Sequence, residues 1–312
     1  MQDKYMSYSK YQSDLRMVAE GWFVEKGLDR DPTYPFVLNR EIPWQYNLID
    51  NDIYENVKHI EPMHPWTRNG LSSQSMCFNL LGPLVGNPKT NNSNLAPLKR
   101  ACENSAIPWP SNAKGQLEFN AMPLFQEASK RQSTSLDVAI NSTPDSDDKS
   151  LFIEVKLSEN RFGGCNYYKK DTCSKSNLTI EEDLDCHYSV KVRTCWTLMR
   201  RHSLLDCDLG ESNECPFRRY FQFFRELLVA LEYRGIYVLL YDEHNPTFIA
   251  PEGSKRTGVF TFLRSRLPDE IQPFVKSFTV QEVLREIATD SSFSHANDFA
   301  VKYGMVDALK NQ

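Results

Sequence analysis

The sequence contains no run of residues that is both long and apolar enough to span a bilayer. Its polar N-terminal segment, residues 1–16, also lacks the apolar h-region of a secretory signal. Eight cysteines are too few to form a disulfide scaffold in a chain of 312 residues. These absences argue against a membrane-spanning protein and a disulfide-rich secreted one. They predict a cytoplasmic protein whose cysteines are free thiols or metal ligands.

The sequence also lacks an excess of positive charge. It has 36 Lys and Arg residues against 41 Asp and Glu residues, which gives a formal net charge of −5. This balance argues against a polybasic, histone-like protein. It does not exclude a nucleic-acid partner, because enzymes that hold divalent cations gather carboxylates at the site and place their basic residues elsewhere.

The pattern along the chain favours one domain with an N-terminal arm. Residues 1–70 are rich in aromatics, proline and polar turns, and we expect irregular structure with short helices packed on a larger body. That body is residues 71–312, and the cysteine-rich, polar stretch 160–214 has the composition of an insertion in it.

Hydrophobic periodicity predicts the elements of this body. We expect strands at 117–122, 134–140, 151–157 and 236–241, and helices at 74–82, 216–232 and 281–287. The segment 86–114 has the composition of a loop, and 141–149 is a clear turn. The order helix, three strands, helix, strand predicts an α/β or α+β body around a mixed sheet.

Two of the predicted strands carry charged residues where charge is costly. Asp137 lies within one strand, and Glu154 and Lys156 interrupt the next, which is the most hydrophobic strand in the chain. Alternation places Glu154 and Lys156 on one face, with Val155 in the core. If a hairpin joins the strands, Asp137 lies beside Glu154 and the two can share a cation. Lys156 would then orient or deprotonate an attacking water.

A simpler interpretation is a surface strand that bears an unrelated Glu and Lys, because a bare acid-x-Lys triplet is a weak signal. The turn also spells a similar motif almost literally, in Pro144-Asp145 and Asp147-Asp148-Lys149. We interpret that copy as solvated hairpin loop.

Three segments together resemble the core of the PD-(D/E)XK nuclease superfamily. They are Ser135-Leu-Asp137, Phe152-Ile-Glu-Val-Lys156 and Ser158-Glu-Asn-Arg-Phe-Gly163. More narrowly, the chain is similar to bacterial restriction endonucleases from about His64 to Tyr303. The individual motifs are short, so the resemblance depends mainly on their order along the chain.

Two flanking helices strengthen this resemblance. Ser72-Ser-Gln74 and Asn79-Leu-Leu81 match a Ser-Ser-Gln helix that ends in an Asn-Leu-Phe-like segment, and Arg219-Tyr-Phe-Gln222 matches an aromatic-Gln helix after the core.

The resemblance implies a restriction-endonuclease-like fold, with a mixed sheet of four or more strands flanked by helices. It implies Asp137 and Glu154 as Mg²⁺ or Mn²⁺ ligands, Lys156 as the water-positioning base, and Gln222 as a supporting polar residue. Many members place a Glu on the first helix, where this chain has Gln74 and Asn79. Glu118 is a candidate for the additional carboxylate, although an exposed strand charge is at least as good an interpretation.

Six cysteines lie in the insertion or directly after it. A structural zinc site would stabilise such a loop-rich segment, and an iron–sulfur cluster is the other candidate. Neither has CxxC spacing, and unligated thiols are the simpler interpretation. The metal hypothesis takes Cys165, Cys173, Cys186 and Cys195 as ligands.

Basic residues are densest beside the aromatic-Gln helix. Arg200, Arg201, Arg218 and Arg219 are candidates for phosphate contacts, which supply affinity and not sequence choice. A solvated helix face is an equal alternative.

The leading functional hypothesis is a Mg²⁺-dependent deoxyribonuclease, an endonuclease of the restriction or defence type acting on double-stranded DNA. A repair or structure-specific nuclease and a non-catalytic nucleic-acid-binding protein are the alternatives. Palindromic cutting would favour a homodimer. The recognition sequence, DNA against RNA, end against internal cleavage and any partner methyltransferase do not follow from the sequence.

Overall fold

The computed structural model describes residues 6–60, 63–86, 93–125, 134–142, 147–165, 189–205, 207, 209, 217–250 and 257–310, with the backbone alone for 189–193. Its centre is a five-stranded mixed sheet with the strand order β1-β2-β3-β4-β5. The first three strands form an antiparallel meander, and β4 and β5 then run parallel to β3. The strands are β1 Lys114–Asn120, β2 Ser135–Asn141, β3 Leu151–Lys156, β4 Ile236–Tyr241 and β5 Val275–Thr279.

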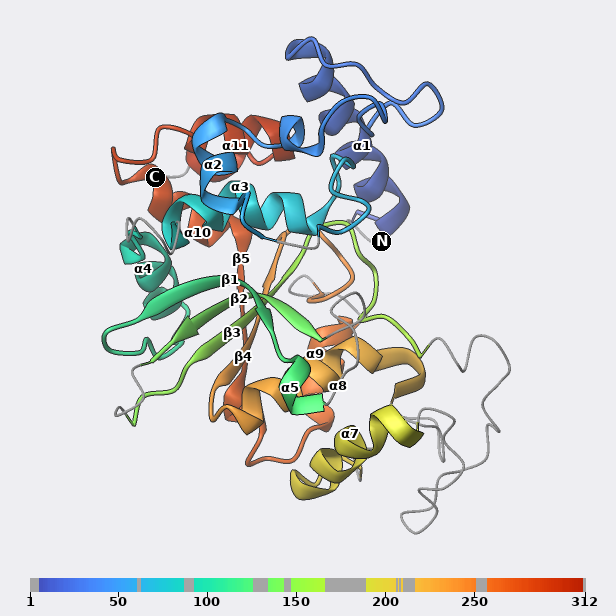
Figure 1. Ribbon diagram of the computed structural model, residues 1–312, viewed down its shortest axis with the longest axis vertical. Helices are drawn as coiled ribbons and strands as arrows, with labels where there is room; N and C mark the ends of the chain where they lie inside the picture. The colour runs from blue at the N-terminus through green and yellow to red at the C-terminus, as the bar shows by residue number, and fades with distance from the viewer. Residues whose placement is uncertain are drawn as a thin grey trace, which may run out of the picture.

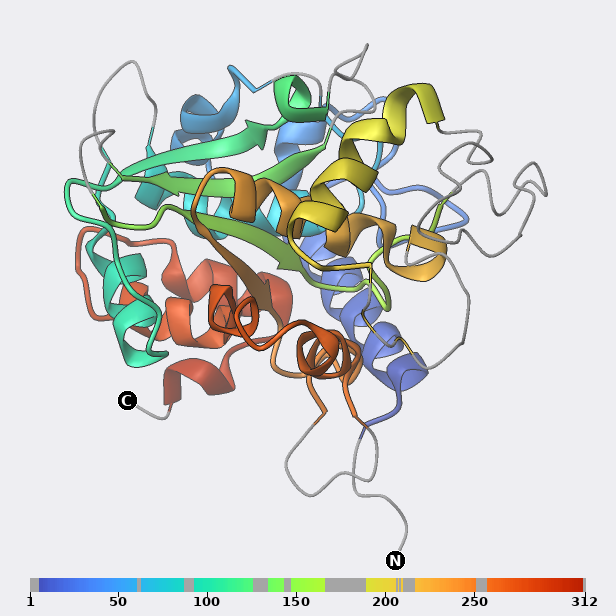
Figure 2. The same cartoon turned by 90° about the horizontal axis from the view of Figure 1, so that it is seen from below.

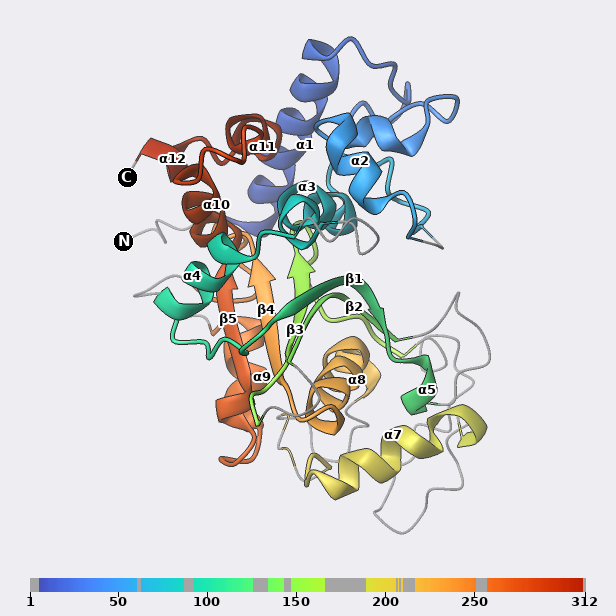
Figure 3. The same cartoon turned by 60° about the vertical axis from the view of Figure 1, so that its left-hand side comes forward.

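Helices cover both faces of this sheet (Figures 1 and 3). One face carries α1 Tyr8–Glu25, α2 Asn51–Val57, α3 Ser73–Val85, α4 Ala96–Asn104, α10 Val280–Ala288, α11 Ala296–Tyr303 and α12 Asp307–Lys310. The other carries α5 Met122–Phe125, α8 Phe217–Glu232 and α9 Val259–Arg266, with α7 Ser189–Arg201 packed outside α8 (Figure 2). Short 3₁₀ helices span Trp44–Asn47 and Gln272–Phe274. No helix of these described ranges has the length and apolarity that a membrane span needs.

Alternation along the strands divides the core into two layers. In β4, Val238 and Leu240 pack beneath α3 and α10, whereas Tyr237 and Leu239 pack beneath α8. Strands β3 and β4 are buried on both faces, which explains why they read as almost continuous apolar runs. The predicted α/β fold with a mixed sheet is therefore confirmed.

Three predictions about elements were wrong. The segment 86–114 contains the nine-residue helix α4, so only parts of it are loop. The N-terminal 70 residues begin with an 18-residue helix, α1, which is longer than the short helices that we expected. Strand β5, directly before the helix predicted at 281–287, was not among the strands that we expected.

Helix α11 is held to the N-terminal arm and to α3 by buried polar contacts. Asn79 Nδ2 donates to the Tyr303 hydroxyl over 2.9 Å, and Lys302 Nζ donates to Asn47 Oδ1 over 2.9 Å. Lys302 is only 2% exposed. Its ammonium lies 5.1 Å from the centre of the Trp22 ring and 5.3 Å from that of the Phe23 ring. Burial, together with the charge of Lys26, lowers the pKa of Lys302 to about 7.

Candidate active site

The β2–β3 hairpin brings Asp137 and Glu154 together. Backbone pairing runs outward from the turn and ends at Val138 opposite Ile153, so Asp137 and Glu154 occupy the next opposed positions. Beyond this point a side chain takes the place of a backbone acceptor, because Asp137 Oδ2 accepts the Val155 N–H over 2.7 Å. A buried N–H needs such a partner, and this contact fixes the Asp137 carboxylate beside β3.

Glu154, Lys156 and Gln222 form a closed triangle of hydrogen bonds. Lys156 Nζ donates to Glu154 Oε1 over 2.6 Å and to Gln222 Oε1 over 3.1 Å. Gln222 Nε2 donates to the same Glu154 oxygen over 2.7 Å. Glu154 is 5% exposed and Lys156 is 3% exposed, so both charges are held in a fixed place away from bulk water.

A kink at the start of α8 places Gln222 over this pair. The backbone of Tyr220 leaves the helical region at φ −124° and ψ 33°. The N–H groups of Phe221 and Gln222 then donate to Gly163 O and Phe162 O, on the segment that follows β3. Gly163 has φ +56°, and an added Cβ would lie 3.6 Å from Gln222 Cβ. Glycine therefore permits the turn that docks the helix on the site.

Helix α3 supplies a second polar group from the opposite side. Ser72 caps the helix by accepting the Ser75 N–H, and this places Gln74 in the first turn. Gln74 Nε2 donates to Glu118 Oε1 over 2.5 Å. Glu118 has φ +50° in the middle of β1, a backbone conformation that costs energy for a residue with a side chain. The amide of Gln74 thus binds the carboxylate of Glu118, a residue whose backbone is strained, near the site.

One buried acid escaped the reasoning from sequence. Glu226 is 2% exposed and lies four residues after Gln222, on the same face of α8. The Tyr237 hydroxyl, on β4, donates to Glu226 Oε2 over 3.2 Å. Its signal was available, because a spacing of four residues on a helix predicts a shared face.

The local charge is strongly negative. Burial and then the neighbouring Glu154 and Glu118 carboxylates raise the pKa of Asp137 well above its usual value. Burial, and more weakly Glu154, raises the pKa of Glu118 to about 7 despite the Gln74 hydrogen bond. Burial alone would lower the pKa of Lys156, but the surrounding glutamates, Glu154 first among them, outweigh it and raise that pKa.

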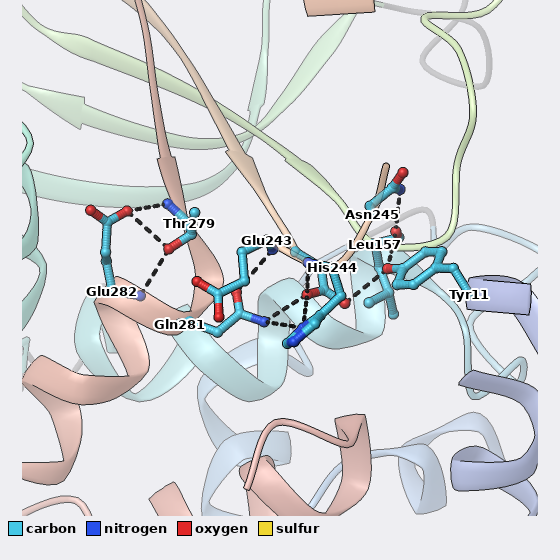
Figure 4. Close-up of polar contacts among 9 residues, drawn as sticks. Tyr11, Leu157, Glu243, His244, Asn245, Thr279, Gln281 and Glu282 are labelled. Atoms are coloured by element: carbon cyan, nitrogen blue, oxygen red, sulfur yellow. Dashed lines mark hydrogen bonds and ion pairs between the residues drawn. The ribbon is translucent and has the colours of Figure 1, made fainter. Parts of the chain in front are cut away.

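A polar cluster supports the end of β3 from behind (Figure 4). Its centre is Asp242, which follows β4 and is 2% exposed. Asp242 Oδ2 contacts the Tyr11 hydroxyl at 2.8 Å, and Oδ1 accepts from Gln281 Nε2 over 2.6 Å. The same Oδ1 lies 3.2 Å from His244 Nδ1. Helices α1 and α10 therefore meet at one carboxylate.

This cluster holds the backbone at Lys156 and Leu157. The Asp242 N–H donates to Lys156 O over 3.2 Å. The Tyr11 hydroxyl donates to Leu157 O over 2.7 Å, and Asn245 Nδ2 donates to the same oxygen over 2.8 Å. The carbonyl groups of Lys156 and Leu157 both accept hydrogen bonds. The cluster therefore fixes the position of the backbone from which the Lys156 side chain extends.

The comparison with protein-family models gave one match. Residues 9–304 match the family described as Restriction Endonuclease associating with ARP. The chain belongs to this family. No curated protein and no solved structure matches it. The resemblance to restriction endonucleases, inferred from short ordered motifs, is confirmed by this match over nearly the whole chain.

Restriction-endonuclease-like families usually use Mg²⁺, and two carboxylates of this site have oxygens that could bind such an ion. The hydrogen bonds described above use one oxygen each of Asp137 and Glu154, which leaves the second oxygen of each carboxylate for a cation. Within the described residues, no three His, Cys, Asp or Glu side chains are grouped so as to hold a metal. Mg²⁺ needs fewer protein ligands, because it keeps several waters and also takes oxygens from a substrate phosphate. The excess of carboxylates over lysine favours a cation here.

The hypothesis of a zinc or iron–sulfur site in this family member gains no support. Cys195 is buried in the apolar layer beneath α7, and Cys165 is a free thiol at the end of the described segment after β3. Cys173 and Cys186 lie outside the described residues.

The candidate phosphate-binding arginines do not form one group around the site. Arg218 and Arg219 begin α8, one turn before Gln222. Arg200 and Arg201 end α7, and Arg201 pairs with Glu232 at 2.7 Å, at the far end of α8.

In the turn after β2, Asp148 accepts the Ser111 N–H and Lys149 lies over the Phe274 ring. This part of the motif-like turn sequence lies outside the strands, while Pro144 and Asp145 lie outside the described residues.

Proposed function

We propose that this member of the family is a Mg²⁺-dependent deoxyribonuclease, an endonuclease of the restriction or defence type. The observation that carries the proposal is the meeting of Asp137, Glu154 and Lys156 where the β2–β3 ladder ends. A structural ion pair would not account for the neighbouring carboxylates, whose mutual repulsion is unfavourable without a cation.

Asp137 and Glu154 would hold the cation through their free oxygens. When bound, the cation would lower the pKa of a coordinated water and offset the charge that develops on the phosphate. Lys156 would place a fixed positive charge beside that water and beside a non-bridging phosphate oxygen. Gln222 would hold the side chains of Lys156 and Glu154 in fixed positions relative to each other, because it forms a hydrogen bond with both. Water would attack the phosphorus directly, with no covalent intermediate.

The test is cleavage of supercoiled and linear DNA with Mg²⁺ or Mn²⁺. Asp137→Asn and Lys156→Met remove one charge each with little change in side-chain size. Matched controls come from the exposed α12 pair, as Asp307→Asn and Lys310→Met. We expect discrete fragments from the wild type and both controls, and a loss of at least about 100-fold in rate from either site variant.

Loss of activity in the control variants, or retention of activity in Asp137→Asn and Lys156→Met, would contradict this assignment. If folded wild-type protein leaves both DNA forms intact with either metal, the enzyme hypothesis fails and a DNA-binding role replaces it.

A further inference from the structure

The large hydrophobic side chain with the highest exposure in the described chain lies at the edge of the candidate site. Trp66 is 64% exposed, although tryptophan is usually mostly buried. It belongs to the turn 63–72, which leads into α3. An exposed indole ring on its own carries little information. Its position and the rigidity of its turn are the informative features.

The turn is linked to the site on two sides. His64 N donates to Gln74 Oε1 over 3.1 Å, and the other end of the same amide bonds to Glu118. Ser158 Oγ, two residues after Lys156, donates to Leu71 O over 3.1 Å. Because Trp66 is only two residues from His64, its backbone lies within roughly 7 Å of that residue. Hydrogen bonds thus connect the turn that carries Trp66 to Glu118 and to the segment directly after Lys156.

The turn is also rigid. Thr67 is 3% exposed, and its carbonyl oxygen accepts both Asn47 Nδ2 over 2.7 Å and Ser75 Oγ over 2.9 Å. Its hydroxyl donates to His64 O over 3.0 Å, and Arg68 Nε donates to Ile42 O over 2.9 Å. Because the backbone of this turn is already ordered, binding of a ligand by Trp66 would cost little backbone conformational entropy.

Exposed cations lie on the same side of the site. The Tyr8 hydroxyl donates to Ser158 O over 2.6 Å. Gln12 Nε2 donates to the same hydroxyl over 3.0 Å, and Arg16 Nη2 donates to Gln12 Oε1 over 3.3 Å, so Arg16 lies near this contact. Arg161 follows Ser158 by three residues in the chain. Arg16 and Arg161 are exposed.

The Arg16 guanidinium lies 5.1 Å from the centre of the Phe36 ring, and Phe36 O accepts the N–H of Gly70, which belongs to the same turn as Trp66. An exposed ring with a guanidinium group near its turn suits a nucleic acid, which offers both a base face and phosphates.

We propose that Trp66 stacks on a nucleobase that is unstacked from the DNA duplex beside the scissile phosphate, while Arg16 and Arg161 contact the adjoining backbone. The inference rests on the proposed function for its ligand, DNA. It assigns a base contact to the N-terminal segment, and it predicts that the protein prefers DNA with locally unpaired bases, for which the cost of unstacking has already been met.

The test is binding of two labelled duplexes with Mg²⁺ present, one fully paired and one with a central run of unpaired bases. Fluorescence anisotropy is measured in the Lys156→Met background, so that the DNA stays intact. Trp66→Leu removes the aromatic face and Trp66→Phe keeps one. We expect Trp66→Leu to bind the unpaired duplex roughly 5- to 150-fold more weakly, and Trp66→Phe to stay within a few-fold of Trp66.

Arg16→Ala and Arg161→Ala serve as matched comparisons. Each should weaken binding of both duplexes equally and reduce the dependence on salt by about one phosphate contact. Equal affinity of the Trp66 and Trp66→Leu proteins for the unpaired duplex would overturn the proposal, as would a Trp66→Phe protein as weak as the Leu variant. These results do not depend on cleavage, so an inactive wild type would refute the proposed function alone.

Discussion

Lys302 offers a quantitative test of the packing between α11 and the N-terminal segment. Its pKa falls from 10.5 to about 7 because burial disfavours the ammonium. Below pH 7 the group is protonated in the folded and the unfolded chain, so the folded state bears the whole cost of the buried charge. Above pH 10.5 it is neutral in both. Stability therefore rises with pH between these values, by roughly 4–5 kcal/mol from this group.

Lys302→Met keeps the length of the side chain and removes the titration. We expect the free energy of unfolding of the wild type, minus that of the variant, to rise by roughly 1.4 kcal/mol per pH unit between pH 7.5 and 10. Loss of the bond to Asn47 shifts this difference by the same amount at every pH, so the slope is the informative quantity. Buried tyrosines and cysteines also titrate in this range, but they are common to both proteins and cancel.

Urea unfolding followed by circular dichroism at four or five pH values measures this slope. Lys310→Met, at an exposed α12 lysine, is the control and should leave the difference flat. A flat profile for Lys302→Met, or stability that falls relative to the variant as pH rises, would refute the account of Lys302 as a buried, mainly neutral amine.

The remaining predictions concern the site and its support. Asp137→Asn should abolish cleavage and, without metal, raise the unfolding temperature, because it removes one of several repelling carboxylates; a drop in that temperature would contradict the electrostatic account. Glu118→Gln should stabilise the metal-free protein at pH 8 and have little effect at pH 4. The pKa of Glu118 is raised to about 7 in the folded protein, so the buried charge becomes costly only as the pH rises above the pKa of this group in the unfolded chain. A pH-independent effect in urea titrations would contradict this prediction. Tyr11→Phe should cost roughly 1–3 kcal/mol of stability, because Leu157 O and Asp242 lose the one buried O–H donor that they share, and an unchanged urea midpoint would contradict this.

Much of this architecture is legible in the sequence, because its signals are local. The β2 and β3 strands follow from apolar alternation around a polar turn, and the pairing of Asp137 with Glu154 then follows from hairpin geometry alone. The helix that carries Gln222 follows from its apolar spacing. In each of these cases a short window of residues contains the whole argument.

The missed features depend on contacts between distant residues. Strand β5 has five residues and alternates poorly, and it becomes a strand because β4 offers a free edge beside it. Asp242 and Tyr11 are 231 positions apart, so no local pattern shows that one bonds to the other. In the Cys-rich insertion, composition suggests ligands but does not place them near each other, and Cys173 and Cys186 lie outside the described residues.

The support of β3 by Asp242 has a consequence for synthesis of the protein. Its partners come from α1, made first, and from α10, where Gln281 is added only after nine-tenths of the chain. A chain still growing on the ribosome has Asp137, Glu154 and Lys156 long before it has the residues that brace them. Strand β3 would therefore be fully secured only near the end of translation, so a truncated product would lack part of the support of the candidate site.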